Sequence, residues 1–178
     1  MAESKSSESI VVPVLYAAFL SAVVAIVSSV HINNYAQLLT LEGLCRVVSF
    51  VASFLFASLY FMDELILRSK ISPRQHLTEV IIWIMWVVQI AAARHYVVMI
   101  GLGGVSATIL LVESVLDNSE WKVENAVWLL FWLLWGLVVF VPIWKWVFVV
   151  LGIFVLAGLM VVKVWRLWNA VNFNNDER

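Results

Sequence analysis

The sequence has few of the residues that build catalytic or metal sites. Cys45 is its single cysteine among 178 residues, which excludes an intrachain disulfide and a cysteine-based zinc or iron–sulfur centre. The histidines His31, His76 and His95 do not have the spacing of a zinc-protease motif. No pattern places a nucleophile beside a base. We therefore expect neither enzymatic activity nor a bound metal or other cofactor.

Charged residues are also scarce. They make up 13 % of the chain, whereas soluble domains average roughly 25 %. With 11 Lys and Arg against 12 Asp and Glu, there is no basic surface for nucleic acid. The chain is instead rich in apolar residues. Hydrophobic residues make up 63 % of it, and its mean hydropathy is +0.98. This composition predicts an integral membrane protein in contact with the lipid bilayer.

Long apolar runs predict an all-α fold of about six transmembrane helices arranged as three hairpins. A bilayer core of about 30 Å needs around 20 helical residues. The transmembrane domain is expected over 10–168, between a tail at 1–9 and a polar tail at 169–178. The expected spans are 10–30, 44–67, one from Pro73 to near Ala93, 96–116, 123–141 and 146–162.

Short polar segments mark the predicted turns. Arg94 and His95 interrupt an apolar stretch that is too long for one span and suits two. The alternative is a longer third helix that turns only at the glycines of 101–104. Asp117, with a glutamate three residues later, predicts an N-terminal cap for the fifth helix. Pro142 is expected to separate the fifth helix from the sixth.

The positive residues predict the orientation of this layout. With six spans both termini share one side of the membrane. That side carries eight basic residues and the other side three, which predicts that both termini are cytoplasmic. The eight are Lys5, Arg68, Lys70, Arg74, Lys122, Lys163, Arg166 and Arg178, and the three are Arg46, Arg94 and Lys145.

Five carboxylates are the strongest candidates for a functional site. In the predicted layout all of them fall at the cytoplasmic interface, where they are candidates for the mouth of a cation path. The alternative is that they reach lipid headgroups or pair with Arg68, Lys122, Lys163 or Arg166. The five residues are Asp63, Glu64, Glu79, Glu113 and Glu124.

Three further sets of residues are noted. A polar cluster is expected at the outer interface, and small residues at spacing four are expected to let helices pack closely or self-associate. A stripe on the fifth helix predicts an aromatic wall, which is either bulky packing or a binding surface. The polar cluster consists of His31, Arg46, Arg94 and His95. The small residues are Ala17, Ser21, Ala25, Ser49, Ser53, Ala57, Gly103 and Ala107. The stripe consists of Asn125, Trp128, Trp132 and Trp135.

Two functions are compatible with this pattern. The first is an oligomeric channel or transporter for a small ion or solute, which the carboxylates and the serine-bearing helices favour. The second is a non-catalytic accessory or scaffold subunit of a larger membrane complex, which the absence of charge at mid-membrane and the 10 tryptophans favour. The expected partners are lipid and either further copies of the chain or other membrane subunits.

Overall fold

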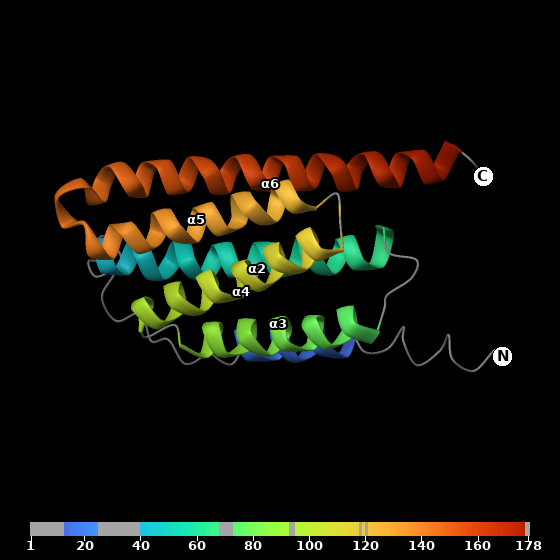
Figure 1. The fold of residues 1–178 in the computed structure, drawn as a ribbon, viewed down its shortest axis with the longest axis horizontal. Helices are drawn as coiled ribbons and strands as arrows, with labels where there is room; N and C mark the ends of the chain where they lie inside the picture. The colour runs from blue at the N-terminus through green and yellow to red at the C-terminus, as the bar shows by residue number, and fades with distance from the viewer. Residues whose placement is uncertain are drawn as a thin grey trace.

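The computed structural model describes residues 13–24, 40–67, 73–92, 95–117, 119 and 121–176, and this part of the chain is all-α (Figure 1). The chain reverses direction at each connection from α2 to α6, so α2, α4 and α6 run one way and α3 and α5 the other (Figure 1). The elements are an N-terminal helix Pro13–Val24, α2 Leu41–Leu67, α3 Pro73–Ala91, α4 Tyr96–Leu116, α5 Lys122–Phe140, the 3-10 turn η2 Pro142–Trp144 and α6 Lys145–Asp176.

The turns lie close to the predicted positions. The fourth helix has the bounds expected from its apolar run, and His95 is its N-cap residue. The described residues therefore form two helices here, with α3 ending at Ala91 and α4 beginning at Tyr96, and not one long helix that turns at the glycines of 101–104. Pro142 opens η2, which joins α5 to α6. The first predicted span, 10–30, is described only over its central helix.

The predicted cap of the fifth helix is wrong. Asp117 ends α4 instead, and its backbone N–H donates to the Glu113 carbonyl at 2.9 Å. The carbonyls in the last turn of a helix need donors, and the backbone of Asp117 supplies one. The N-cap of α5 is Trp121, which makes no side-chain capping bond; its N–H donates to Ser119 Oγ at 3.2 Å.

Helix α6 is longer than its apolar run. The sequence predicts a span that ends at Val162 and a polar tail from residue 169, whereas the helix continues to Asp176. After Gly158 this segment contains neither glycine nor proline, so no residue interrupts the backbone hydrogen bonds. Its final turns extend beyond the neighbouring helices (Figure 1).

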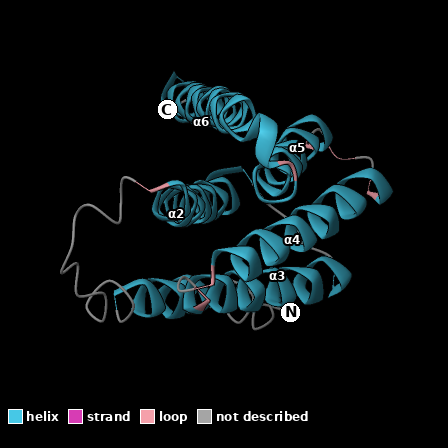
Figure 2. Cartoon of the chain, turned by 90° about the vertical axis from the view of Figure 1, so that its left-hand side faces the viewer, coloured by secondary structure: helices cyan, strands magenta, loops and turns pink. Residues whose placement is uncertain are grey.

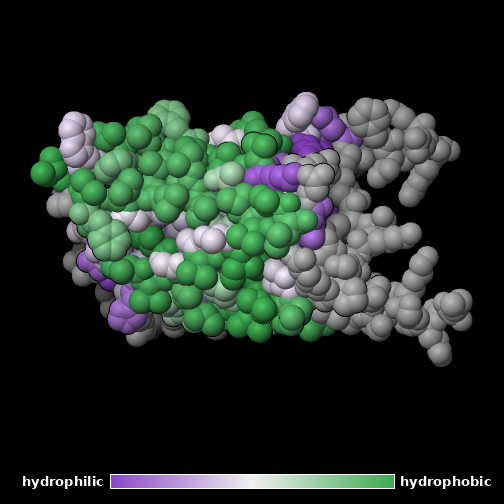
Figure 3. All heavy atoms as spheres, in the orientation of Figure 1, coloured by the Kyte–Doolittle hydropathy of each residue, from purple (hydrophilic) through white to green (hydrophobic). Residues whose placement is uncertain are grey.

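Four helices are long and apolar enough to cross a membrane. They are Leu41–Asp63, Tyr96–Leu116, Lys122–Phe140 and Lys145–Asn169, while Pro13–Val24 and Leu77–Ala91 are shorter apolar helices. Hydrophobic residues cover most of the face drawn in Figure 3, with hydrophilic ones gathered toward its ends. The polytopic membrane architecture is therefore supported for these four helices.

Helix α2 lies beside α3, α4 and α6, and aromatic side chains join it to the N-terminal helix and to α5 (Figure 2). On one side it meets the N-terminal helix, where the Tyr16 ring stacks on Phe61 at 4.1 Å and its hydroxyl donates to Ser58 Oγ at 3.1 Å. It meets α3 through Trp86, whose ring packs edge-on against Tyr60 at 5.5 Å. Contacts with α4 complete this side.

On its other side α2 meets the α5–α6 hairpin. Trp135 of α5 donates its indole N–H to Ser49 Oγ at 2.9 Å, and both residues are buried. Near the other end of α2, Asp63 accepts a hydrogen bond from Lys163 of α6 at 2.8 Å. Because lipid supplies no partner for such groups, these bonds tie the hairpin to α2.

Two glycines allow indole rings to lie directly against a helix backbone. A Cβ atom at Gly103 of α4 would overlap the ring of Trp132, and one at Gly152 of α6 would lie 2.9 Å from Cε3 of Trp135. Close approach of this kind is a principal source of attraction between helices in lipid. By contrast, a Cβ at Gly101 would have nothing within 4 Å.

We expect Gly103→Ala to destabilise the protein by about 1–3 kcal/mol, because the new methyl group displaces the Trp132 ring. Gly101→Ala is the matched control; it is expected to be neutral or to stabilise by up to about 1 kcal/mol, since alanine favours the helix. Denaturant unfolding in detergent micelles, followed by circular dichroism, measures both. Equal stability of the two variants would contradict the packing described for Gly103.

Candidate functional site

Four ionisable side chains from three helices meet at one end of the bundle. Asp63 lies near the end of α2, Glu124 in the first turn of α5, and Lys163 and Arg166 on α6. Residues three apart lie on the same face of a helix, so both cations point toward the same neighbours. We call these four residues the charge cluster.

Each cation of the charge cluster contacts both carboxylates. Lys163 Nζ lies 2.8 Å from Asp63 Oδ2 and 3.1 Å from Glu124 Oε2. Arg166 lies 2.7 Å from Glu124 Oε1 and 3.4 Å from Asp63 Oδ2. With all four groups ionised their formal charges cancel. The cluster therefore links α6 to α2 and to α5 through separate carboxylates.

Exposure changes across the charge cluster. The side chains of Asp63 and Lys163 are 1 % exposed, whereas that of Arg166 is 23 % exposed. Aromatic rings cover the cations: Lys163 Nζ lies 4.9 Å from the centre of the Phe56 ring, and the Arg166 guanidinium 3.8 Å from that of Trp121. Such cation–π contacts strengthen when water is excluded. Arg166 is thus the most exposed member of the charge cluster.

The charge cluster lies far along α6. At 1.5 Å per residue, Lys163 is roughly 27 Å from the start of this helix, close to the thickness of a bilayer core. The same end of the bundle holds the end of α2 and the start of α5 (Figure 1). Lys163 and Asp63 are 1 % exposed there, and such buried charges need partners inside the protein.

The other predicted carboxylates lie at the same end of the bundle. Glu79 near the start of α3 and Glu113 near the end of α4 are 2 % and 8 % exposed. The side chain of Glu64 lies outside the described residues. Of the five candidates, the structure therefore brings Asp63 and Glu124 together, and it does so through the cations named as their alternative partners.

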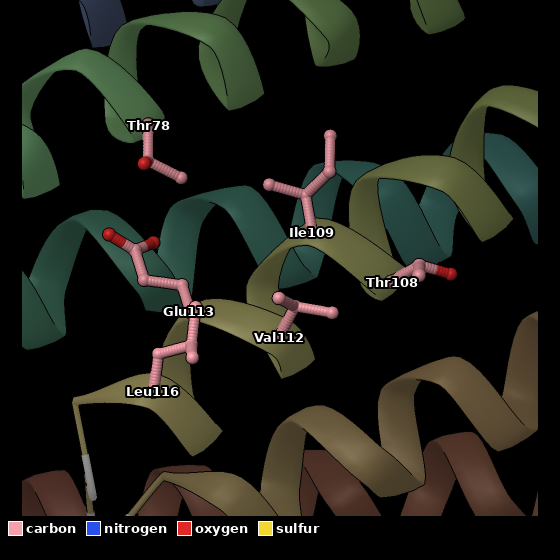
Figure 4. A pocket seen from close by; sticks show the side chains of 6 residues that line it. All are labelled: Thr78, Thr108, Ile109, Val112, Glu113 and Leu116. Carbon is pink, nitrogen blue, oxygen red and sulfur yellow. The ribbon is translucent and has the colours of Figure 1, made fainter.

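Glu113 also lines a groove between α3 and α4 with a volume of about 220 Å³. Its carboxylate and the side chain of Thr78 extend toward one another from the two helices (Figure 4). The lining is otherwise mainly aliphatic, and comprises Thr78, Thr108, Ile109, Val112, Glu113 and Leu116.

The expected outer cluster is only partly described. His31 and Arg94 lie outside the described residues. Arg46 pairs with Glu42 one turn earlier on α2, and both side chains are substantially exposed, at 42 % and 52 %. His95 is exposed at the start of α4. Among the described residues, no group of three or more His, Cys, Asp and Glu side chains is arranged to hold a metal ion.

The small residues of α2 and α4 are buried. This applies to Ser49, Ser53, Ala57, Gly103 and Ala107. Ala17 and Ser21 are exposed in the N-terminal helix, and Ala25 lies outside the described residues. The predicted stripe on α5 is core packing, since Asn125, Trp128, Trp132 and Trp135 are all buried.

Sequence reasoning missed three features of the interior. It did not foresee that one pair of cations would serve both carboxylates. It also missed the bond from Gln89 of α3 to the Met99 carbonyl, at 2.9 Å, and the bond from Asn125 to the Leu110 carbonyl, at 3.2 Å. The available signal was the spacing of Lys163 and Arg166 near the end of the longest apolar helix.

Comparison of the chain with known protein families, with curated proteins and with solved structures finds no match. The functional argument therefore depends on the geometry of the charge cluster.

We expect Lys163→Met to destabilise the protein by about 3–5 kcal/mol, because it leaves a buried carboxylate uncompensated. The double variant Asp63→Leu with Lys163→Met is expected to recover most of this loss, since Glu124 and Arg166 still form a pair. Unfolding in micelles measures both variants.

Arg46→Gln is the control for Lys163→Met, and its expected effect is at most about 1 kcal/mol because the pair that it breaks is exposed. If Lys163→Met costs no more than Arg46→Gln, the charge cluster does not hold the helices together.

Proposed function

We propose that the protein is a small channel or transporter that moves a small ion or solute across a membrane, with the charge cluster as its gate. The observation that carries this proposal is the convergence of four charged residues from α2, α5 and α6 inside an apolar bundle. Replacing a buried ion pair by apolar side chains is often neutral or stabilising. Stability alone therefore does not explain why these charges are buried in the bundle, whereas ion pathways use such charges.

The packing of the interior limits where a path can run. Phe56, Trp86, Trp128 and Trp135 are fully buried and fill the space between α2, α3 and α5. We therefore place the path at the seam between α2 and α6, beside the charge cluster, or between copies of the chain in an oligomer. Glu79 and Glu113 add carboxylates at the same end, where they would attract cations toward the mouth.

The orientation of this mouth follows from the positive residues. The excess of Lys and Arg at the end that carries the charge cluster favours a cytoplasmic position for that end and for both termini. The gate would then face the cytoplasm.

We expect purified protein in liposomes to pass an ion, and we expect the double variant Asp63→Leu with Lys163→Met to lower the flux. A decrease of about tenfold would correspond to about 1.4 kcal/mol of barrier. This variant retains a balanced Glu124–Arg166 pair, so a lower flux reports on the gate and not on unfolding. Flux is measured with ion-sensitive dyes under several ionic gradients.

The matched control for the flux measurement removes the exposed pair at the opposite end, by Glu42→Gln with Arg46→Gln, and should leave the flux unchanged. Absence of flux under every gradient would overturn the proposal. Equal flux from the two double variants would remove the charge cluster from the path.

A second candidate function, an accessory subunit of a membrane complex, is favoured by helix α6. Its Lys145–Asn169 span has a mean hydropathy of 2.8, and the share of its most apolar window that is buried in the bundle is 22 %. Large apolar side chains such as Phe154 and Trp165 lie on its free surface, 71 % and 65 % exposed. A second membrane protein packed on α6 would cover them.

The accessory-subunit hypothesis predicts a membrane partner that co-purifies in fixed stoichiometry in mild detergent. Phe154→Ala should release this partner, while Val105→Ala on α4, 53 % exposed, should retain it. Quantitative mass spectrometry of the purified complex measures the ratio. Purification of the chain alone, or equal retention by both variants, would contradict this hypothesis.

A further inference from the structure

The two oxygens of the Asp63 carboxylate differ in their surroundings. Oδ2 lies within 2.8 Å of Lys163 and 3.4 Å of Arg166. Oδ1 is buried and has no hydrogen-bond partner. A buried carboxylate oxygen without a donor is costly in a medium of low polarity. Oδ1 is therefore free to accept a proton or a hydrogen bond. Whatever binds there must fit into the enclosed space around this oxygen.

We infer that the charge cluster binds a proton at Asp63 Oδ1 and that the proton is the ion that the proposed gate controls. This inference deepens the proposed function, on which its transport part rests. The contacts between the cations and carboxylates are direct, at 2.7–3.4 Å, so a hydrated metal cation could enter only by separating them. A proton needs no such space.

Asp63 is the favoured acceptor because of what faces each carboxylate. The charged groups facing Asp63 are Lys163 and Arg166 from α6 and Glu124 from α5. Glu124 has a cation within ion-pair distance of each oxygen, Arg166 at Oε1 and Lys163 at Oε2, although Oε2 makes no hydrogen bond. Asp63 has both cations on Oδ2. A proton at Oδ1 therefore displaces no existing contact.

Proton binding changes the charge of the cluster. A proton from the aqueous side forms an O–H bond at Asp63 Oδ1, no group is oxidised or reduced, and the formal charge of the cluster rises from zero to +1. An excess charge in a poorly polar interior is unfavourable. Arg166, the most exposed member, can relieve it by moving toward water. Lys163 keeps its contact with Glu124, 3.1 Å away.

This sequence of events loosens one seam of the bundle. Asp63 carries the ion pairs between α2 and α6, while Glu124 carries those between α5 and α6. Protonation of Asp63 weakens the first set and leaves the second in place. The end of α2 that carries Asp63 then separates from α6, while the hydrogen bond from Trp135 to Ser49 holds α2 to α5 toward its other end. The seam that opens is the one at which the gate is placed.

The first test measures helix separation as the pH is lowered. In a Cys45→Ala background, spin labels at positions 62 and 162 join α2 to α6, and labels at 123 and 162 join α5 to α6; the native side chains there are all exposed. We expect the dipolar coupling of the 62–162 pair to weaken at low pH and that of the 123–162 pair to stay constant.

Variants identify the group that responds. Asp63→Asn should show the separated state at every pH, whereas Glu42→Gln, which removes an exposed carboxylate near the opposite end of α2, should keep the response. A 62–162 coupling that does not change with pH would overturn the inference. So would an Asp63→Asn protein that responds as the native chain does.

A second measurement leaves Asp63 in place, which matters if Asp63→Asn does not fold. The sequence holds three aspartates, so Asp117→Asn and Asp176→Asn leave Asp63 alone. Carbon-13 NMR of this protein, labelled at the aspartate carboxyl carbon and held in lipid, should show a protonation step over the pH range in which the helices separate. No step in that range would contradict proton binding at Asp63.

Proton uptake into liposomes that contain a pH-sensitive dye separates the two proposals. Protonation and helix separation without proton flux would refute the proposed transport function and leave the proton site standing. Flux of another ion without protonation of Asp63 would refute the proton site and leave transport standing. Proton flux whose pH dependence is lost in Asp63→Asn and retained in Glu42→Gln would support both.

Discussion

Lipid gives helices neither hydrogen bonds nor a hydrophobic reason to associate, and the structure depends on how the chain meets this constraint. Association must come from close packing and from polar groups that satisfy one another. Helix α2 supplies both, because its aromatic rings stack on those of its neighbours, and Ser49, Ser58 and Asp63 form hydrogen bonds to them. Gly103 and Gly152 allow close packing on α4 and α6, where each admits an indole ring. The bundle is thus organised around one central helix.

The charge cluster is a second response to the same constraint. A single buried cation would be expensive, and so would a single carboxylate. Sharing two cations between two carboxylates removes the net charge while linking three helices. The consequence is that the cluster is sensitive to protonation, since any change in the charge of one member leaves the other charges unbalanced. The charge cluster is therefore stable while its charges balance, and it responds when the charge of one member changes.

The sequence was sufficient to predict the helices but not their contacts. The lengths of the apolar runs and the position of Pro142 predicted where the helices lie, and α4 has the predicted bounds. Both signals are local, because a span has to match the thickness of the bilayer and a proline lacks the backbone N–H that continues a helix. The runs are apolar on nearly all faces, so periodicity could not show which helices are neighbours. Asp117 was misassigned because capping patterns fit either end of a short turn. For Asp63 and Glu124, the predicted layout placed both at the same end of the bundle, whereas their shared cations depend on the tertiary packing of α6.

The length of α6 has a mechanical consequence. About 20 Å of this helix, at 1.5 Å per residue, continues past Lys163 to Asp176. A rigid rod held near one point acts as a lever, so a tilt of about 10° at the charge cluster would carry the tip of this helix through about 3 Å. Small rearrangements at the charge cluster would therefore be amplified into larger displacements at the C-terminal end of α6.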